Sequence, residues 1–214
     1  MSSSKPIECK KLNENFNFKV TGDSVINAKA LQPFLTSLKS NTAIIEISND
    51  GTAPISNVDI SATKTTETAS TSTPTTNLEN VILLESNWDI GSINPKSSKQ
   101  FTATIYVPNT LKGDTLRIPL SISYYNAHGD QHTISKTIDF YIKGLIDLRI
   151  FNVDVIELSD TQMIVGEIIN EGNEDGLFGF VSVEPRGVSN IKSNTQFIDE
   201  IETDAPVPFN LLID

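Results

Sequence analysis

The pattern of apolar and polar residues in this chain occurs twice, in the same order. The first copy has an apolar run at Thr42–Ile47 that breaks near Asn49-Asp50-Gly51, and the second has a run at Met163–Ile169 that breaks at Asn170-Glu171-Gly172. An alternating stretch, an apolar stretch beside an acid and a strand-like run follow each break: Val58–Ser61, Trp88–Ile90 and the run from Phe101 in the first copy, Phe180–Val183, Phe197–Asp199 and the run from Phe209 in the second. The first copy is longer by the segment Thr65–Asn77. Duplication of a β-rich unit predicts a modular architecture.

The residue pattern predicts an all-β fold. β-branched and aromatic residues alternate with polar ones almost throughout, and no window keeps a helical period. Asn126–Asp130 is predicted to be a hairpin loop. Strands are expected at Asn15–Val25, Thr42–Ser48, Val58–Lys64, Val81–Glu85, Phe101–Val107, Leu116–Tyr125 and Thr133–Lys143. Seven strands within about 130 residues are what an immunoglobulin-like sandwich requires.

The duplication predicts two tandem immunoglobulin-like β-sandwich domains. We expect a disordered tail at residues 1–14, a first sandwich at residues 15–144 and a second at residues 145–214, with Gly144 at the boundary. Leu145–Ile150 alternates strictly, which predicts a strand buried on one face. A linker this short predicts an end-to-end arrangement with limited bending.

The second sandwich is predicted to be truncated at its C-terminus. In the first copy 43 residues follow Phe101 up to Gly144 and supply the closing pair of strands, whereas five follow Phe209. A sandwich without its last two strands leaves unpaired backbone groups and an open core. We expect either a fragment of a longer repeat protein or a chain completed by strands from another chain.

Charge and composition restrict the classes of partner. The net charge is −11, and residues 145–214, with 14 acids and three Lys or Arg, carry all of the excess. This segment does not suit nucleic acid, because few cations are available to displace counterions from phosphates. Its acidity promotes solubility and repulsion between modules; bridging of copies by Ca²⁺ is the alternative, although no Asp-x-Asp-x-Asp-Gly loop occurs.

Targeting signals are also absent from the sequence. No apolar run is long enough to span the roughly 30 Å hydrocarbon core of a membrane. The N-terminus lacks the apolar region of a secretory signal, so the chain is either cytoplasmic or a fragment that has lost its leader. Cys9 is the only cysteine, which excludes an internal disulfide and is interpreted as a free thiol on the tail.

No catalytic, cofactor-binding or metal site is predicted, and we expect no enzyme activity. His128, Asp130 and His132 share the expected hairpin, but their spacing is not diagnostic of a metal site. Asp199 and Glu200 are the carboxylate pair that a hydrolase would need. Adjacent strand residues point to opposite faces, so one of the two is expected to turn inward and one outward.

Three further features allow two interpretations each. Trp88 is the only tryptophan and is expected to be a core or inter-sheet aromatic, the alternative being a platform for sugars. Thr65–Asn77 is of low complexity, so it is expected to be an exposed loop, either a variable insertion or an O-glycosylated patch. Tyr124 and Tyr125 are expected to alternate between a buried and an exposed face.

The segments Trp88–Pro108 and Pro119–Asp130, with the two Asn-x-Gly breaks, resemble the Ig-like repeat of archaeal S-layer-associated surface proteins, which is related to the bacterial cell-adhesion-related (CARDB) modules. The resemblance implies an exported cell-envelope protein, located extracellularly or at the cell surface, with no catalytic residues. The expected function is a non-catalytic structural or adhesive segment that acts as a semi-rigid repeat spacer. Its expected partners are other copies or surface proteins, bound through strand edges, and glycans. The alternatives are an accessory carbohydrate-binding module of a secreted enzyme and a hydrolase using the acidic pair.

Overall fold

The computed structural model describes residues 22–62, 78–158, 161–184 and 195–213. Alternating apolar residues place nearly all regular structure in strands, with two short 3-10 turns, η1 (Leu78–Asn80) and η2 (Asn109–Leu111). The first unit comprises β1 (Ile26–Ala30), β2 (Phe34–Thr36), β3 (Lys39–Asn49), β4 (Ile55–Ala62), β5 (Ile82–Leu83), β6 (Asn87–Ile93), β7 (Ser97–Val107), β8 (Thr115–Tyr125) and β9 (Gln131–Lys143). The second unit comprises β10 (Leu148–Leu158), β11 (Thr161–Asn170), β12 (Gly176–Ser182), β13 (Thr195–Ile201) and β14 (Val207–Ile213).

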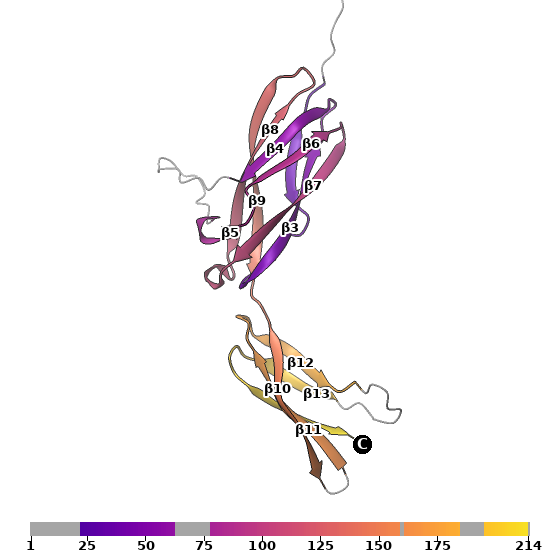
Figure 1. Cartoon of the computed structure of the whole chain (residues 1–214), viewed down its shortest axis with the longest axis vertical. Coiled ribbons are helices and arrows are strands. Elements are labelled where there is room, and N and C mark those ends of the chain that lie inside the picture. The colour runs from indigo at the N-terminus through magenta and orange to yellow at the C-terminus, as the bar shows by residue number, and fades with distance from the viewer. Residues whose placement is uncertain (1–21, 63–77, 159–160, 185–194, 214) are drawn as a thin grey trace, which may run out of the picture.

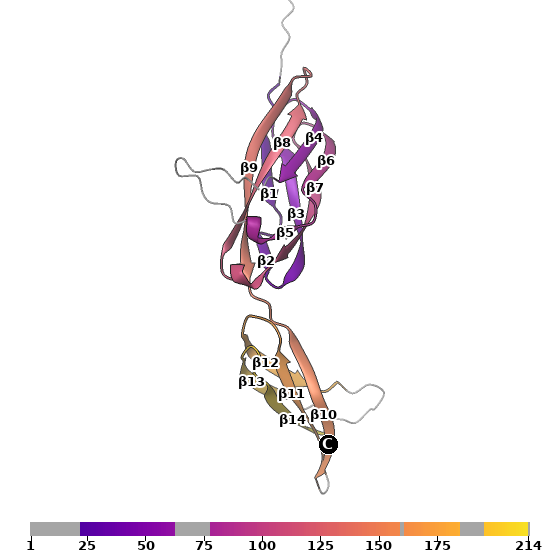
Figure 2. The same ribbon diagram turned by 60° about the vertical axis from the view of Figure 1, so that its left-hand side comes forward.

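The first unit is an immunoglobulin-like sandwich. One sheet has the order β1-β3-β7-β5 and the other β2-β9-β8-β4-β6. The four-stranded sheet facing β9-β8-β4 reproduces the ABED and GFC strand order of immunoglobulin domains, with β2 and β6 added at the edges of the second sheet. Figures 1 and 2 show these two layers in the upper part of the molecule. The predicted all-β sandwich fold is confirmed.

The core of the first unit lies between the two sheets. Alternate residues of β3, β7 and β8 point inward, and Ile47, Ile105 and Ile122 are completely buried. Burying each such side chain contributes roughly 1.5–3 kcal/mol. Tyr124 is buried and Tyr125 exposed, as their alternation predicts.

The second unit has the same plan with fewer strands. Its sheets are β10-β11-β14 and β12-β13, which correspond to β1-β3-β7 and β4-β6 of the first unit. The core is correspondingly small: Ile168, Val181, Ile198, Ile201, Phe209 and Leu211. Within the described residues nothing corresponds to β8 and β9, in agreement with the prediction that the last strands are missing.

A buried asparagine ends the same strand in both units. Asn49 and Asn170 are fully buried. Each Nδ2 donates to the carbonyl four residues on (2.8 and 2.7 Å) and to the carbonyl of the last residue of β6 or β13 (3.4 and 3.3 Å). Each Oδ1 accepts the N–H of the glycine two residues on, Gly51 or Gly172, at 3.1 Å. A Cβ on either glycine would clash with the backbone carbonyl of the incoming chain, Asp23 or Leu145. The matching geometry shows that the two Asn-x-Gly breaks are equivalent corners.

The structure shifts the alignment of β12 and β13 with β4 and β6 by one residue from the alignment predicted from the sequence. Asp59 pairs with Asp89 across β4 and β6, and Phe180 pairs with Phe197 across β12 and β13 at the equivalent position. Asp59 therefore corresponds to Phe180, whereas the sequence had matched Val58. A one-residue slip moves a strand's side chains to the other face, and alternation alone does not fix the register.

Several predicted strand limits are wrong. Residues 22–25, within the strand predicted at Asn15–Val25, form no strand, and β1 begins at Ile26. The strand predicted at Leu145–Ile150 begins at Leu148, because the residues before it form the corner around Asn170. The short strand β2 and the bulged strand β6 were not predicted as strands.

Other predictions lie outside what the structure describes or are not tested by it. The tail at residues 1–14, Cys9 and the loop Thr65–Asn77 lie outside the described residues. The domain boundary at Gly144 stays a prediction. The chain does pass from one hydrophobic cluster to the other at this point, and the two units lie end to end (Figure 1).

We predict that Asn49→Ala destabilises the first unit by about 3 kcal/mol, because it removes a buried amide and leaves two carbonyls and one N–H without their partner. Urea unfolding followed by circular dichroism measures this change. Asn27→Ala is the matched control, since Asn27 is exposed and bonds only to the exposed Asp50; equal losses in both variants would contradict a structural role for the buried corner.

Candidate functional site

The two histidines lie in the β8–β9 hairpin, whose turn is held by the side chain of Asn126. The Asn126 Oδ1 accepts the N–H groups of His128 (2.8 Å) and Asp130 (3.0 Å), and Gly129 has φ +85°. The His132 ring stacks on Tyr124 with centroids 5.5 Å apart. No group of three His, Cys, Asp or Glu side chains in the described ranges is arranged to hold a metal ion.

The acidic pair predicted for a hydrolase is not brought together in a cleft. Asp199 and Glu200 lie on β13 and are both exposed. The expectation that one of them turns inward is wrong, because Ile198 and Ile201 fill the inward positions on either side of the pair.

Trp88 is an inter-sheet aromatic, as predicted. Its ring lies 4.8 Å from that of Phe101, and it packs against the first core. Its Nε1 is buried and has no hydrogen-bond partner. One face of the indole ring is therefore occupied by the protein itself.

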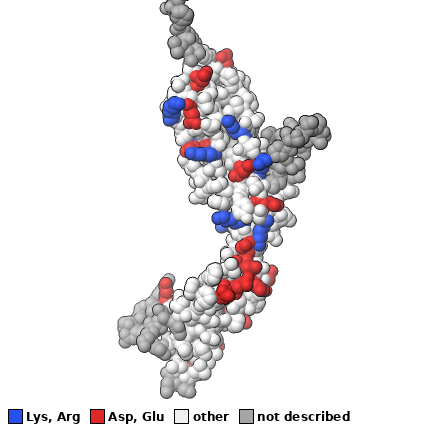
Figure 3. Space-filling view, turned by 180° about the vertical axis from the view of Figure 1, so that it is seen from behind, with Lys and Arg blue, Asp and Glu red and all other residues white. Residues whose placement is uncertain are grey.

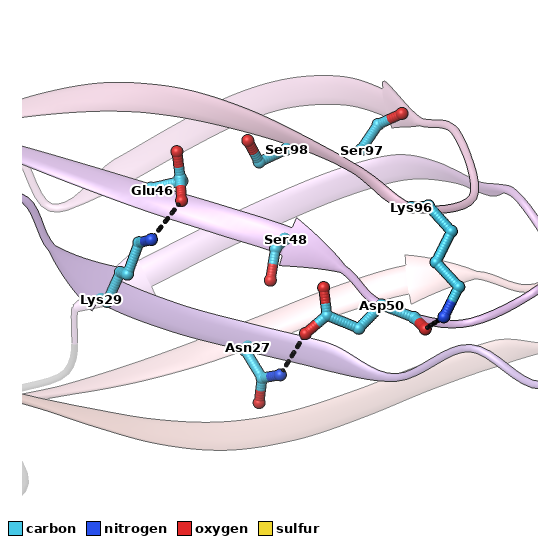
Figure 4. Close-up of a pocket in the computed structure, with 8 residues that line it drawn as sticks. All are labelled: Asn27, Lys29, Glu46, Ser48, Asp50, Lys96, Ser97 and Ser98. Carbon is cyan, nitrogen blue, oxygen red and sulfur yellow. Dashed lines mark hydrogen bonds and ion pairs between the residues drawn. The ribbon is translucent and has the colours of Figure 1, made fainter.

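A shallow polar depression of about 450 Å³ lies on the outer face of β1 and β3 (Figure 4). Lys29 pairs with Glu46 at 2.9 Å, and Asn27 donates to Asp50 at 2.6 Å. The hydrogen bond between Lys29 and Glu46 lowers the pKa of Glu46 and raises the pKa of Lys29. The ammonium of Lys96 donates to the backbone carbonyl of Asp50, so each charged side chain that lines the depression has a partner.

The strongest candidate for a functional site is the open side of the second unit. In the first unit β4 pairs with β6 on one side and with β8 on the other. In the second unit β12 pairs with β13 alone among the described strands. Among the described residues the other edge of β12 therefore has no partner strand, and an edge of this kind is the template that an added strand uses.

The inner face of β10 lacks the cover that its counterpart has. Ile26 of β1 lies opposite Asn49 and is 4% exposed, because β9 packs over β1. Its counterpart Leu148 lies opposite Asn170 and is 46% exposed. The next inward residue, Ile150, lies opposite the buried Ile168 and is 59% exposed. The prediction that this strand is buried on one face is wrong, because no strand in the described part of the chain covers it.

An aromatic pair lies on the outward face beside the free edge. Phe180 of β12 and Phe197 of β13 are 69% and 51% exposed, with ring centroids 5.2 Å apart. The first unit has Asp59 and Asp89 at these positions. Leu177 and Phe178 of β12 are exposed as well. We call the free edge of β12 with the uncovered inner residues Leu148 and Ile150 the open edge.

The outward aromatic pair beside the open edge was not predicted from the sequence. The one-residue slip in matching the two copies hid the outward orientation of Phe180 and Phe197. A comparison that fixes the two corner asparagines first and then counts from them recovers both positions, since Asp59 and Phe180 each lie ten residues beyond their asparagine.

The comparisons with known proteins identify no family. Neither the protein-family models nor the curated proteins compared with this chain match it. Solved structures that it resembles include a chaperone–tip adhesin complex of CFA/I fimbriae (TM-score 0.22, 8% identity, 85% of this chain and 87% of that chain) and the class 5 fimbriae chaperone CfaA (0.23, 9%, 85% and 84%). A third is the secreted serine protease VesC from Vibrio cholerae (0.28, 11%, 86% and 41%). TM-scores this low carry no argument, and the fold assignment rests on the strand pairing.

No helix among the described residues is long and apolar enough to cross a membrane.

We predict that Phe180→Asp changes the free energy of unfolding of the second unit by no more than about 0.5 kcal/mol, because this side chain faces solvent. Val181→Asp, one residue on, should cost at least about 2 kcal/mol, because it places a carboxylate in the core. Urea titration followed by NMR signals of β11 and β14 separates the two variants; the reverse order would show that the register described here is wrong.

Proposed function

We propose that this chain is a non-catalytic structural or adhesive segment of a cell-surface, S-layer-like protein, in which it acts as a semi-rigid repeat spacer. The observation that carries the proposal is the junction between the two units. Side chains from both units hold this junction, in addition to the linker.

Asn173, in the corner loop of the second unit, is the centre of the junction. Its Nδ2 donates to the Oγ of Ser37 at 2.8 Å and also to Asn109. Its Oδ1 accepts the backbone N–H of Leu145 at 2.6 Å. Ser37 is fully buried and also bonds to the carbonyl of Lys143 through its own N–H (2.9 Å). One amide thus ties the linker and the first unit to the second.

Opposite charges meet across the same junction. Lys112 of the first unit donates to the carbonyl of Asn173 and forms an ion pair with Glu174 at 2.6 Å. Figure 3 shows acidic side chains gathered at the end of the second unit that faces the first, below basic side chains of the first. Because the ion pair is partly exposed, it contributes only about 0.2–1 kcal/mol. The part-buried hydrogen bonds of Asn173 to Ser37 and Leu145 contribute roughly 0.5–1.5 kcal/mol each.

Steric contact adds to the restriction of the linker. A Cβ on Gly144 would clash with the side chain of Glu174. The linker therefore passes close against the corner loop, which limits the bending directions open to it. An extended molecule with a restrained joint is suited to spacing or presenting loops and strand edges.

The rest of the proposal concerns location and partners. The resemblance to S-layer-associated repeats implies an extracellular or cell-surface location. The free edge of β12 supports binding of other copies or of surface proteins through strand edges.

A carbohydrate-binding module is the alternative function. Trp88 lines a shallow depression with Asp59, Ser61, Asn87 and Ser123, a mixture of groups that can bond to sugar hydroxyls. Saturable sugar binding that is lost in Trp88→Ala would support this function, but the packing of Trp88 on Phe101 leaves less of the ring free for stacking.

We predict that Asn173→Ala loosens the joint. Spin labels placed at Thr133→Cys and Gln162→Cys, one in each unit, in a Cys9→Ser background, should give a narrow distance distribution by double electron–electron resonance. Asn173→Ala should broaden this distribution at least twofold, since it removes the hydrogen bonds to Ser37, Asn109 and Leu145.

Asn87→Ala is the matched control, because Asn87 lies on β6 and bonds only to the neighbouring Ser86. This variant should keep the parent distribution. A parent distribution already as broad as that of Asn173→Ala would contradict the semi-rigid spacer.

A further inference from the structure

We propose that residues Asn15–Val20 of a second copy of this chain fill the place of β8 at the open edge, so that copies join head to tail. The inference deepens the proposed structural function and rests on it, since it names the partner of a strand edge. Three observations carry it: the occupied edge of the first unit, the residue pattern of Asn15–Val20, and the opposite charges of the two segments.

The first unit shows what the open edge is built to receive. There β8 runs antiparallel to β4, with Ile122 opposite Ile60 and Leu120 opposite Ala62. All four residues are buried, so β8 both pairs with the edge and closes the core. The equivalent inward positions are Val181 of β12 for Ile60 and Val183, which follows β12 directly, for Ala62. Val181 belongs to the second core, and Val183 packs against it. A strand in the place of β8 must therefore present large apolar side chains at every second position.

The inner face of β12 carries smaller residues than that of β4. Gly176 and Gly179 stand where the first unit has the buried Ile55 and Val58. A Cβ on Gly179 would lie 3.0 Å from the Cδ1 of Ile201, and one on Gly176 would lie 3.6 Å from the Cγ2 of Ile146, so these isoleucines take up part of the space. The apolar positions left for an incoming strand to cover are therefore Val181 and Val183.

Asn15–Val20 has the required pattern. Phe16, Phe18 and Val20 alternate with Asn15, Asn17 and Lys19. The pattern gives one apolar and one polar face when the segment is extended. By the register of β8, Phe16 lies opposite Val183 and Phe18 opposite Val181. Val20 takes the place of Tyr124, beside the point where the register of β4 and β8 shifts.

The same register places Lys19 on the outward face beside Phe180. That ring is exposed, and an ammonium group over an aromatic ring is attracted to the negative face of the ring. The phenylalanine that replaces Asp59 of the first unit thus has a partner in this arrangement.

The charges of the two segments are complementary. Residues 1–21 carry four Lys and two Glu, whereas residues 145–214 carry 14 acids and three Lys or Arg. The first segment is therefore attracted to the second unit, and the attraction weakens with salt.

The donor must come from another molecule. Gly22 lies close to Thr52, at the end of the first unit where β3 ends and far from the junction at Lys143. The 13 residues of β9 connect these two ends and span roughly 40 Å at about 3.3 Å per residue. Phe18 lies four residues from Gly22 and reaches at most about 14 Å from it. The contact is heterologous, and such contacts propagate into open chains of copies.

Disulfide cross-linking of the full-length chain tests the register. In a Cys9→Ser background, Asn17→Cys and Ser182→Cys lie opposite each other on the outward face of the proposed pair and should form intermolecular disulfides, giving a ladder of multimers under non-reducing conditions. The matched control joins Asn17→Cys with Ser61→Cys, the equivalent position in the first unit, whose edge β8 already occupies; it should give no ladder of disulfide-linked multimers. Equal ladders in both pairs, or none in either, would overturn the proposal.

Light scattering coupled to size exclusion tests the donor segment. The full-length chain should form multimers whose size rises with concentration. Phe16→Ser with Phe18→Ser should weaken association at least tenfold, whereas Asn15→Ser with Asn17→Ser, on the polar face, should change it less than threefold. A parent chain that is monomeric at about 100 µM refutes the assembly. Multimers that persist in the Phe double variant refute Asn15–Val20 as the donor; pairing of the β12 edges of two copies would give this result.

A failure here is separable from a failure of the spacer proposal. The distance measurement between Thr133→Cys and Gln162→Cys reports on the joint within one molecule and can be made in the Phe double variant. A narrow distribution without assembly would keep the spacer and reject the strand donation.

Discussion

Pairing of backbone groups along strand edges is the constraint on which this structure depends. A strand in a sandwich has to satisfy two rows of N–H and C=O groups, and β4 does so between β6 and β8. Its counterpart β12 has one described partner, β13. The difference accounts for the small second core, for the exposure of Leu148 and Ile150, and for the proposal that another strand is added at this edge.

The buried asparagine corner is the element that makes the two copies comparable. Asn49 and Asn170 each bond to two backbone groups of their own corner loop and to the carbonyl of the last residue of β6 or β13, so the corner fixes where these elements lie relative to one another. Aligning the two copies at this asparagine shows where their corner loops differ. Asn173 and Glu174 occupy the positions of Thr52 and Ala53 and reach across to the first unit. The same corner loop can thus act as a joint when another unit precedes it.

The sequence predicted the fold well because alternation and turn residues are local signals. Strands such as β3, β7 and β8 and the hairpin at Asn126–Asp130 follow from them directly. The register of β12 and β13 did not follow, because Phe180–Val183 alternates with apolar residues on one face and a mixed pair on the other, so the pattern fits with either residue inward. Leu148 and Ile150 are exposed because no strand among the described residues covers them. The role of Asn173 depends on a contact with Ser37, 136 residues away. Neither leaves a local trace in the sequence.

Hydrogen exchange of the β12 amides tests the open edge most directly. It is measured by NMR in the Phe16→Ser, Phe18→Ser double variant, whose association is expected to be weakened, at a concentration where it is monomeric, with β4 as the internal reference because β4 is paired on both sides. If the edge is open, the amides of Gly179–Ser182 that point away from β13 exchange without protection. The amides of Asp59–Ala62, which pair with β6 and β8, are protected. Uniform protection of β12, equal to that of β4, would show that the second sandwich is closed and would contradict the account.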